Sequence, residues 1–280
     1  MKTSTEIGSF SRIIGEESAV ELVAKAGFDA FDFSMFEMCR WDKVNNRPKD
    51  STHPLSSSNY LAFAKRLRQI GLDSGIVCNQ SHAPFPSRLV GMDNLRRAIE
   101  CTAEAGGQIC VIHPDNNGTA EQNAEMYHEL LPFAKQHGVK IATENMWNWD
   151  KEHGIALPAA CSSVQSFTEH IKTVNDSDFI ACLDIGHAEM MGETVSAEQM
   201  IFALRDKLGA LHIHDNDKIH DSHQIPGSMK IDFKPIAAAL KSIGYNGYYT
   251  LEADRYFDNY APEDILSGLK RLRQSLEIFK

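Results

Sequence analysis

Short apolar runs alternate along the chain with longer segments in which apolar residues recur every three or four positions. The short runs, rich in isoleucine, valine and leucine, are typical of strands buried on both faces of a parallel sheet. The longer segments are typical of helices that bury one face, and in the first of them Val20, Val23 and Ala24 share that face. The expected strands lie within residues 5–10, 30–35, 74–84, 108–114, 140–146, 179–188, 210–215 and 247–254, and the sixth of them ends at Asp184. The expected helices are residues 16–28, 59–72, 92–107, 123–138, 163–175, 196–209, 232–245 and 262–279.

Each expected strand is followed by an expected helix, so the chain reads as eight strand–helix units. This order predicts an α/β protein in which residues 1–280 form a single (β/α)8 TIM barrel. A doubly wound open sheet is the alternative architecture, but no glycine-rich turn follows the first expected strand. The long polar segment at about 37–58 is expected to be a loop at the barrel mouth and a candidate lid.

Composition and charge narrow the range of partners. The 280 residues are 42% hydrophobic and 24% charged, which is an ordinary globular composition. The 38 acidic and 28 basic side chains give a net charge of −10 without any long basic run, which argues against nucleic acid and favours a small substrate or a bound cation. The N-terminus does not resemble a signal peptide, no stretch is apolar enough for a membrane span, and the six cysteines form no CxxC pair. We therefore expect a cytoplasmic protein with reduced thiols.

Side chains suited to metal binding lie at or just beyond the C-terminal ends of six expected strands. These strand ends meet at one mouth of a TIM barrel, so the side chains are expected to converge. They are His82, His113, Glu144, Asp184, His187, His214, Asp221, His223 and Glu252. A mixture of carboxylates and imidazoles favours zinc, manganese, cobalt or iron over calcium. A compact core set would comprise Glu144, Asp184, His214 and Glu252. The others would complete one or two further sites, so we expect one to three divalent ions. Zinc and manganese are the metals that we expect most.

The seventh expected strand indicates which side chains point into the barrel. Leu211 and Ile213 share one face of this strand, and His212 and His214 share the other. If the apolar pair faces the outer helices, both histidines point inward. His212 would lie one layer below His214, and we expect it to be packed rather than ligating.

Each candidate ligand also has a purely structural interpretation. A histidine at a strand end is often only hydrogen-bonded, and Asp221 with the following Pro-Gly pair is compatible with a simple turn. Glu252 could pair with Arg255. Trp147 and Trp149 follow Glu144 closely, and they could either form a wall on which a sugar stacks or pack under their own loop. Carboxylates buried without a partner are costly, however, and a metal removes that cost.

Six motifs resemble the xylose-isomerase-like TIM barrels, a superfamily that includes sugar phosphate isomerases and epimerases, ketose 3-epimerases and endonuclease IV. They are SHAPF (81–85), VIHP (111–114), TEN (143–145), LDIGHA (183–188), HIHDND…DSHQIPG (212–227) and LEAD (251–254). The resemblance extends along nearly the whole chain. It implies a divalent-metal site at the mouth of a (β/α)8 barrel.

The similarity to the ketose 3-epimerases implies specific roles for individual residues. The metal ligands that it implies are Glu144, Asp184, His214 and Glu252. The two glutamates would also exchange the substrate proton. His187 falls at the position of a substrate-binding histidine, and Asp150 at that of a substrate-facing glutamate. His220 stands where the epimerases have an arginine, so the chain departs from their pattern at this position. Trp147 is a further candidate for contact with the substrate.

The similarity to endonuclease IV implies a trinuclear zinc site. The additional ligands that it implies are His82, His113, His187, Asp221 and His223. We expect a metal-dependent isomerase or epimerase whose substrate is a sugar or a sugar derivative. Two alternatives stay open: a multinuclear zinc phosphodiesterase that acts on abasic DNA, and a non-catalytic, metal-containing barrel that binds a sugar. A homo-oligomer is compatible with the sequence.

Overall fold

The computed structural model describes residues 1–42, 44–190 and 196–280. Across these residues eight parallel strands form one sheet in the order β11–β10–β7–β6–β5–β2–β1–β12. The strands are β1 (Lys2–Glu6), β2 (Ala30–Ser34), β5 (Val77–His82), β6 (Ile109–Val111), β7 (Lys140–Glu144), β10 (Phe179–Asp184), β11 (Leu208–His212) and β12 (Tyr248–Leu251). A parallel bridge between Ile213 and Leu251 joins the two ends of the sheet. The predicted TIM barrel is therefore confirmed.

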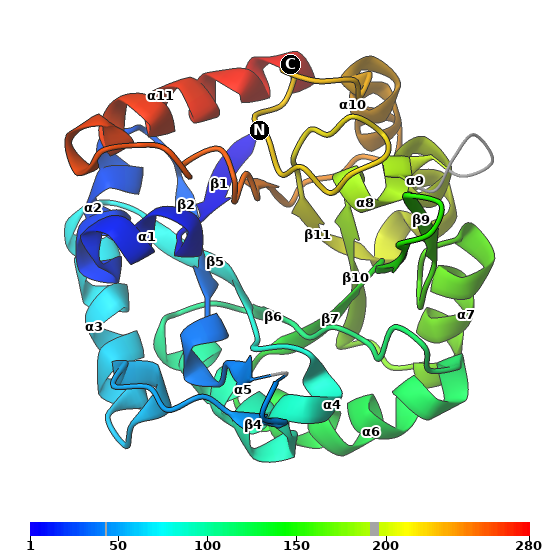
Figure 1. Ribbon diagram of the computed structural model, residues 1–280, viewed down its shortest axis with the longest axis horizontal. Coiled ribbons are helices and arrows are strands. Elements are labelled where there is room, and N and C mark those ends of the chain that lie inside the picture. The colour runs from blue at the N-terminus through cyan, green and yellow to red at the C-terminus, as the bar shows by residue number, and fades with distance from the viewer. Residues whose placement is uncertain (43, 191–195) are drawn as a thin grey trace.

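Helices surround the strands as an outer ring (Figure 1). They are α1 (Gly8–Ile14), α2 (Glu16–Lys25), α3 (Tyr60–Asp73), α4 (Ser87–Val90), α5 (Met92–Glu104), α6 (Ala120–Gln136), α7 (Val164–Val174), α8 (Ile185–Met190), α9 (Ala197–Leu204), α10 (Phe233–Ser242) and α11 (Ile265–Ser275). Both chain termini lie on the same side of the barrel, next to α11 (Figure 1). Among the described residues, no helix is both long and apolar enough to cross a membrane.

The apolar core has two parts that match the two faces of the strands. The larger part lies between the barrel and the helices and includes Leu211 and Ile213. The smaller part consists of Val111, Ala142, Ile180, Cys182 and Ala210. Leu211 and Ile213 thus face the helices as expected, which leaves the opposite face of β11 to His212. All six cysteines are buried and free.

All eight strands differ from their expected ranges by at least one residue, and the first strand differs most. The strand expected at 5–10 is wrong, because β1 begins at Lys2 and residues 8–10 already belong to α1. The polar start of β1 is possible because Thr3 donates to Asp29 (2.8 Å) and Ser4 donates to Asn79 (2.6 Å). The sixth strand ends at Asp184, as expected, and α8 follows directly. Asp184 Oδ1 accepts a hydrogen bond from the His187 amide (2.6 Å), which fixes the start of that helix.

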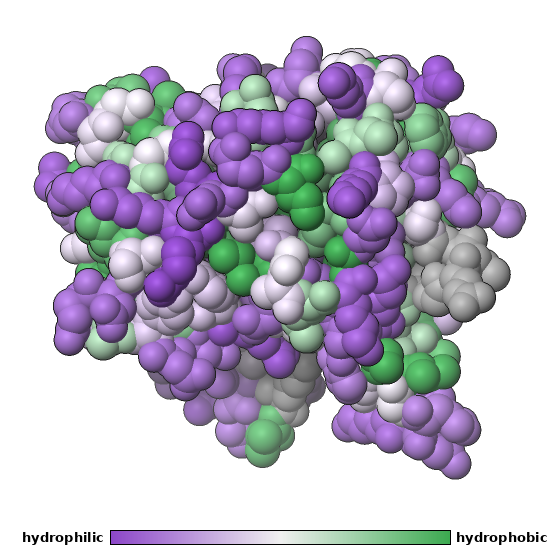
Figure 2. Space-filling view, turned by 90° about the horizontal axis from the view of Figure 1, so that it is seen from above, coloured by the Kyte–Doolittle hydropathy of each residue, from purple (hydrophilic) through white to green (hydrophobic). Residues whose placement is uncertain are grey.

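Two antiparallel hairpins extend from the strand ends: β3 (Trp41–Asp42) with β4 (Arg47–Pro48), and β8 (Trp147–Asp150) with β9 (Ile155–Pro158). The first lies in the expected loop at 37–58, in which position 43 lies outside the described residues. The end of this loop is anchored, because Arg97 donates to the carbonyls of Leu55 (2.9 Å) and Ser57 (2.6 Å). Its role as a lid stays a prediction. Figure 2 shows a mainly hydrophilic surface with hydrophobic side chains in small separate patches.

Candidate metal centre and active-site cavity

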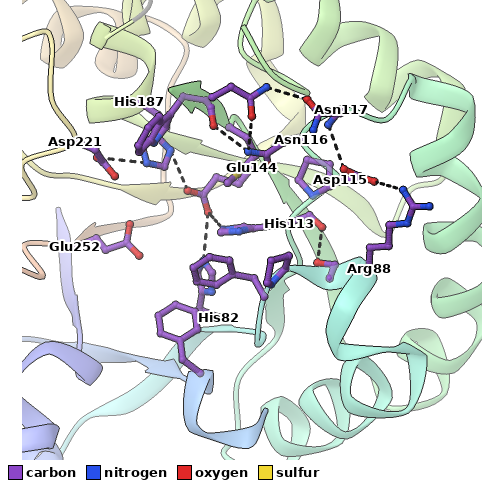
Figure 3. A pocket seen from close by; sticks show the side chains of 18 of the residues that line it. His82, Arg88, His113, Asp115, Asn116, Asn117, Glu144, His187, Asp221 and Glu252 are labelled. Atoms are coloured by element: carbon purple, nitrogen blue, oxygen red, sulfur yellow. Dashed lines mark hydrogen bonds and ion pairs between the residues drawn. The ribbon is translucent and has the colours of Figure 1, made fainter. Parts of the chain in front are cut away.

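The predicted ligand-type side chains lie together at the C-terminal mouth of the barrel. Seven of them line a cavity of about 530 Å³ (Figure 3). The seven are His82, His113, Glu144, His187, Asp221, His223 and Glu252. The other two, Asp184 and His214, are fully buried beside them, with Asp184 Oδ1 3.2 Å from His214 Nε2. The structure therefore brings all nine residues to one place.

Glu144, the last residue of β7, lies at the centre of this arrangement (Figure 3). Its Oε2 lies 3.6 Å from His82 Nε2 and 3.3 Å from His113 Nε2. The same oxygen lies 3.1 Å from His212 Nδ1, and Oε1 lies 3.5 Å from His187 Nδ1. One carboxylate thus faces four imidazoles, which come from β5, β11, α8 and the residues that follow β6. His212, expected to be packed rather than ligating, lies among the ligand-type atoms.

The ligand-type atoms form five groups, some of which overlap, and within each of which they all lie within 4.8 Å of one another; three of these groups together contain all nine predicted ligands. The deep group consists of Glu144, Asp184, His212 and Glu252. The side group consists of His82, His113 and Glu144. The rim group consists of His187, His214, Asp221 and His223. Because the deep and side groups share Glu144, this carboxylate is placed to bridge two neighbouring ions.

Asp221 connects the histidines of the rim group. Its Oδ1 lies 3.5 Å from His187 Nε2 and 3.6 Å from His214 Nε2. Its Oδ2 accepts a hydrogen bond from His223 Nε2 at 3.0 Å. The rings of His214 and His223 are stacked, with their centroids 3.8 Å apart. The rim group is therefore a compact set of three imidazoles around one carboxylate.

Several polar atoms of these groups are buried and have no hydrogen-bond partner among the described residues. They are Nδ1 and Nε2 of His113, Oε2 of Glu144, Oδ2 of Asp184, Nδ1 of His212, Nδ1 and Nε2 of His214, and Oδ1 of Asp221. Buried polar groups without partners are costly and rare in folded proteins. Imidazole nitrogens and carboxylate oxygens are the ligands of zinc and similar divalent ions. The donor set therefore fits a divalent metal.

Four of the histidines are held by one ring nitrogen, which leaves the other directed at a carboxylate. The anchoring hydrogen bonds run from His82 Nδ1 to the Ala83 carbonyl (3.1 Å), from His187 Nδ1 to the Asn145 carbonyl (2.9 Å), from His223 Nδ1 to the Glu252 carbonyl (2.7 Å) and from His212 Nε2 to Asp32 Oδ2 (3.2 Å). Such bonds fix the tautomer and the orientation of metal-ligating histidines. The imidazoles are thus oriented by the protein itself.

The two glutamates have opposite pKa shifts. Burial alone would raise the pKa of Glu144, but the neighbouring His212 and His113 outweigh burial and hold the pKa well below its usual range. Burial raises the pKa of Glu252 well above its usual range, because His212 offsets burial only partly and Glu144 adds repulsion. The same cavity therefore gives its two glutamates different affinities for a proton.

The four residues expected to contact the substrate lie in different places. Trp147 and His187 line the cavity. Asp150 does not line it, because its oxygens accept bonds from the Glu152 amide (2.8 Å) and from His153 Nδ1 (2.7 Å) and thereby close the β8–β9 turn. His220 is likewise absent from the lining; its Nδ1 lies 2.8 Å from Asp217 Oδ2, and its ring lies beside Trp149.

Sequence reasoning missed Asp32, which pairs with His212 of the deep group, and it missed a second cavity. Asp32 and His212 are fully buried and paired, and the charge of Asp32 within the apolar run AFDFS was the signal for it. The second cavity, about 470 Å³, shares Phe36 and Asp254 with the first. It includes the buried Glu6 at the end of β1. The cavity walls at this mouth thus extend beyond the candidate metal ligands.

Comparison with known proteins identifies the family. The family model for the xylose isomerase-like TIM barrel matches residues 20–275. The uncharacterized protein MJ1311 of Methanocaldococcus jannaschii is 26% identical over 268 residues, which cover 89% of this chain and 83% of that protein. The fructoselysine 3-epimerase of Escherichia coli O157:H7 is 26% identical over 153 residues, 55% of this chain and 52% of that enzyme.

Solved structures share the fold over the whole chain. A D-tagatose 3-epimerase-like protein is 23% identical with a TM-score of 0.73, and the match covers 100% of this chain and 98% of that one. The IOLI protein, solved with a binding zinc atom, is 17% identical with a TM-score of 0.73 and the same coverage. At these identities the likeness shows the fold alone. Because the family model spans most of its length, the chain belongs to the xylose isomerase-like TIM barrel family.

Proposed function

We propose that the protein is a divalent-metal-dependent isomerase or epimerase of a sugar or sugar derivative. The observation that carries this proposal is the convergence of unpartnered, buried carboxylate oxygens and imidazole nitrogens on one cavity. A cavity of about 530 Å³ has the size of a small-molecule site. The similarity to a fructoselysine 3-epimerase and to the fold of a D-tagatose 3-epimerase-like protein supports the same class of reaction.

The deep group would hold the principal ion through Glu144, Asp184, His212 and Glu252. His214, the imidazole predicted for this set, lies with the rim group instead. We expect zinc or manganese, with cobalt and iron as alternatives, and up to two further ions at the side and rim groups. A bound divalent ion polarises a carbonyl oxygen and thereby acidifies the neighbouring C–H group.

The two glutamates would carry out the proton transfer. Glu144 belongs to β7 and Glu252 follows β12, so the two carboxylates reach the cavity from different strands. Both line the cavity, where one can take the proton next to the carbonyl and the other can deliver a proton. Trp147 lines the wall of the same cavity, where its ring can pack against the C–H face of a sugar.

A multinuclear zinc phosphodiesterase acting on abasic DNA is the second candidate. The observation that favours it is the set of three ligand groups, two of which share Glu144. The charge of the cavity argues against it, since DNA binding requires several Lys or Arg contacts to phosphates. Among the residues that line the cavity, Arg88 is the one Lys or Arg side chain, and it lies 3.3 Å from Asp115. We therefore favour the isomerase.

The test combines elemental analysis with exchange of substrate hydrogen. Protein purified without chelator is incubated in D2O with ketoses, aldoses and their amino and phosphate derivatives, and NMR follows deuterium uptake next to the carbonyl. We expect uptake with at least one sugar, and its loss in Glu144→Gln and Glu252→Gln. Glu125→Gln is the matched control, because Glu125 is exposed on α6.

Other outcomes would contradict the proposal. Cleavage of abasic DNA without deuterium uptake from any sugar would favour the phosphodiesterase. Tight binding of a sugar without uptake would favour a non-catalytic sugar-binding barrel. Full deuterium uptake in either glutamate variant would refute the assignment of that residue.

A further inference from the structure

The second cavity, about 470 Å³, adjoins the candidate active site at the mouth of the barrel. Phe36 and Asp254 line both cavities, so these two side chains mark the place where the cavities meet. Phe36 begins a short 3-10 helix after β2, and Asp254 follows β12 two positions after Glu252. Small-molecule sites have volumes of roughly 300–1,000 Å³. Each cavity alone can therefore hold a small molecule, and the two together suit a larger one.

The wall of the second cavity is almost entirely polar. Besides Gly8 and Phe36, its lining consists of serine, glutamate, aspartate, arginine and histidine side chains. Phe36 is the one apolar side chain in this lining. A wall of this kind suits a hydrophilic unit that makes several hydrogen bonds and packs one C–H face against an aromatic ring.

The cationic side chains of this lining already have anionic partners. The pairs are Arg12 with Asp258, Arg40 with Glu37, and His53 with Glu16. Glu6 and Asp254 line the same cavity, and neither forms an ion pair within the described ranges of the chain. The charge that remains for a ligand is therefore negative. It disfavours a phosphate or carboxylate group and favours hydrogen-bond donors.

Glu6 is held in a fixed orientation at the end of β1. Its side chain is buried, the Ser9 amide donates to Oε2 (3.0 Å), and the Ser9 hydroxyl donates to Oε1. The Ser34 hydroxyl lies 3.4 Å from Oε2. Burial and repulsion from Asp254 both raise the pKa of Glu6, which shows that the two acidic groups lie near each other. A hydrogen-bond donor placed between them would relieve this repulsion.

We propose that the second cavity is a subsite of the candidate active site, and that the substrate is a sugar extended by a second unit that carries hydroxyl or ammonium groups and no negative charge. Glu6 and Asp254 would accept hydrogen bonds from this second unit, and Phe36 would pack between it and the reacting sugar. This assignment rests on the proposed function, which places the reacting sugar in the first cavity. It adds the class of sugar derivative that the protein selects.

The test compares ketoses that differ only in their extension. D-Fructose and D-tagatose are used free and extended at carbon 1 or carbon 6 by a glucosyl, an amino or a phosphate group. Deuterium uptake gives kcat/KM, and isothermal titration calorimetry gives Kd. We expect a glucosyl or amino extension to raise kcat/KM at least about tenfold, the effect of one hydrogen bond to a charged group. The phosphate extension should lower it. The larger of the two gains identifies the donor as hydroxyl or ammonium.

Two variants test the place of the second unit. Glu6→Gln removes a carboxylate of the subsite, and Ser34→Gln puts a longer side chain into the second cavity. Both should lower the ratio of kcat/KM between extended and free ketose about tenfold. The ratio is the decisive quantity, because a general disturbance of the fold would lower both values together. Glu125→Gln, on the exposed side of α6, is the matched control and should keep the ratio. Circular dichroism checks that each variant is folded.

The contrary results are distinct. Equal kcat/KM for free and extended ketoses would overturn the subsite and leave the proposed function supported. A preference for the phosphate extension would overturn the assigned charge, and an unchanged ratio in both variants would place the second unit elsewhere. Binding of extended sugars that weakens in Glu6→Gln, without deuterium uptake from any sugar, would contradict the proposed function and support the subsite. Neither binding nor uptake with any of these sugars would refute both.

Discussion

At the scale of the residue, Gly186 makes room for the ring of His214. A Cβ at this position of α8 would overlap the imidazole of His214. We expect Gly186→Ala to displace that ring and to lower the affinity of the rim group for cobalt about tenfold. The deep group should bind as before, because the three atoms nearest to such a Cβ all belong to the ring of His214. Unchanged binding of every cobalt equivalent in a titration of the metal-stripped protein would contradict the placement of His214 in the rim group.

Glu6 makes the stability of the fold depend on pH. Burial, together with repulsion from Asp254, raises the pKa of Glu6 from 4.5 to about 8, although Ser9 donates to it. Between these values the folded protein holds a proton that the unfolded chain has released, so the free energy of unfolding falls as the pH rises. The contribution is fully present below 4.5 and is lost as the pH passes about 8.

Replacing Glu6 by glutamine should remove this dependence. Each unit of pKa difference corresponds to about 1.4 kcal/mol, so Glu6→Gln should gain a few kcal/mol over the unaltered protein at high pH. Near pH 4.5 the two proteins should differ little, since the carboxyl is then neutral in the folded state. Urea unfolding at acidic and mildly alkaline pH measures the difference. An equal difference at both pH values would show that Glu6 is not protonated in the fold.

At the scale of the element, the β8–β9 hairpin offers a matched pair of tryptophans. Trp147 lines the cavity and lies beside His187, whereas Trp149 lies beside His220 outside the lining. An aromatic contact contributes roughly 0.5–1.5 kcal/mol. We therefore expect Trp147→Ala to raise KM roughly 2- to 12-fold for the sugar that proves active, and Trp149→Ala to leave KM nearly unchanged. Equal effects of the two variants would mean that the hairpin, and not Trp147, shapes the site.

The elements also show what the sequence could predict. Glu144 and Asp184 each end an apolar run, and the pattern of runs predicted the barrel, so their convergence followed from the fold. The start of β1 could not be predicted, because Ser4 is tolerated in a strand only through its bond to Asn79, far along the chain.

The pairing of Asp32 with His212 depends on contacts across the barrel in the same way. These two residues are 180 positions apart, on strands that are not neighbours in the sheet. A charged residue in an apolar run indicates that a partner exists, but only the closed barrel identifies it. Asp150 shows the opposite case, because the similarity to the ketose 3-epimerases implied a position facing the substrate, whereas the turn of the β8–β9 hairpin takes both its oxygens.

At the scale of the whole molecule, the candidate ligands bring side chains from most of the strands together at the mouth of the barrel. They come from six of the eight strands or from the residues that follow them: β5, β6, β7, β10, β11 and β12. A bound ion would therefore connect most of the circumference, including β11 and β12, where the sheet closes. Without an ion, the buried carboxylates and imidazoles of these strands would face one another without partners. Metal binding should consequently stabilise the fold as a whole.

If metal binding stabilises the whole fold, removal of the metal with a chelator should lower the Tm considerably. An ion present at a thousand times its Kd stabilises the folded state by about 4 kcal/mol, and each kcal/mol shifts Tm by roughly 2–4 °C in a protein of this size class. We expect removal of the metal to lower Tm by about 10 °C, and added zinc or manganese to restore it. Glu144→Gln, which lacks the shared carboxylate, should lose most of this difference between its stripped and metal-loaded forms. Elemental analysis checks that the metal has been removed from the unaltered protein. If its Tm is then unchanged, the ion does not stabilise the contacts between the strands.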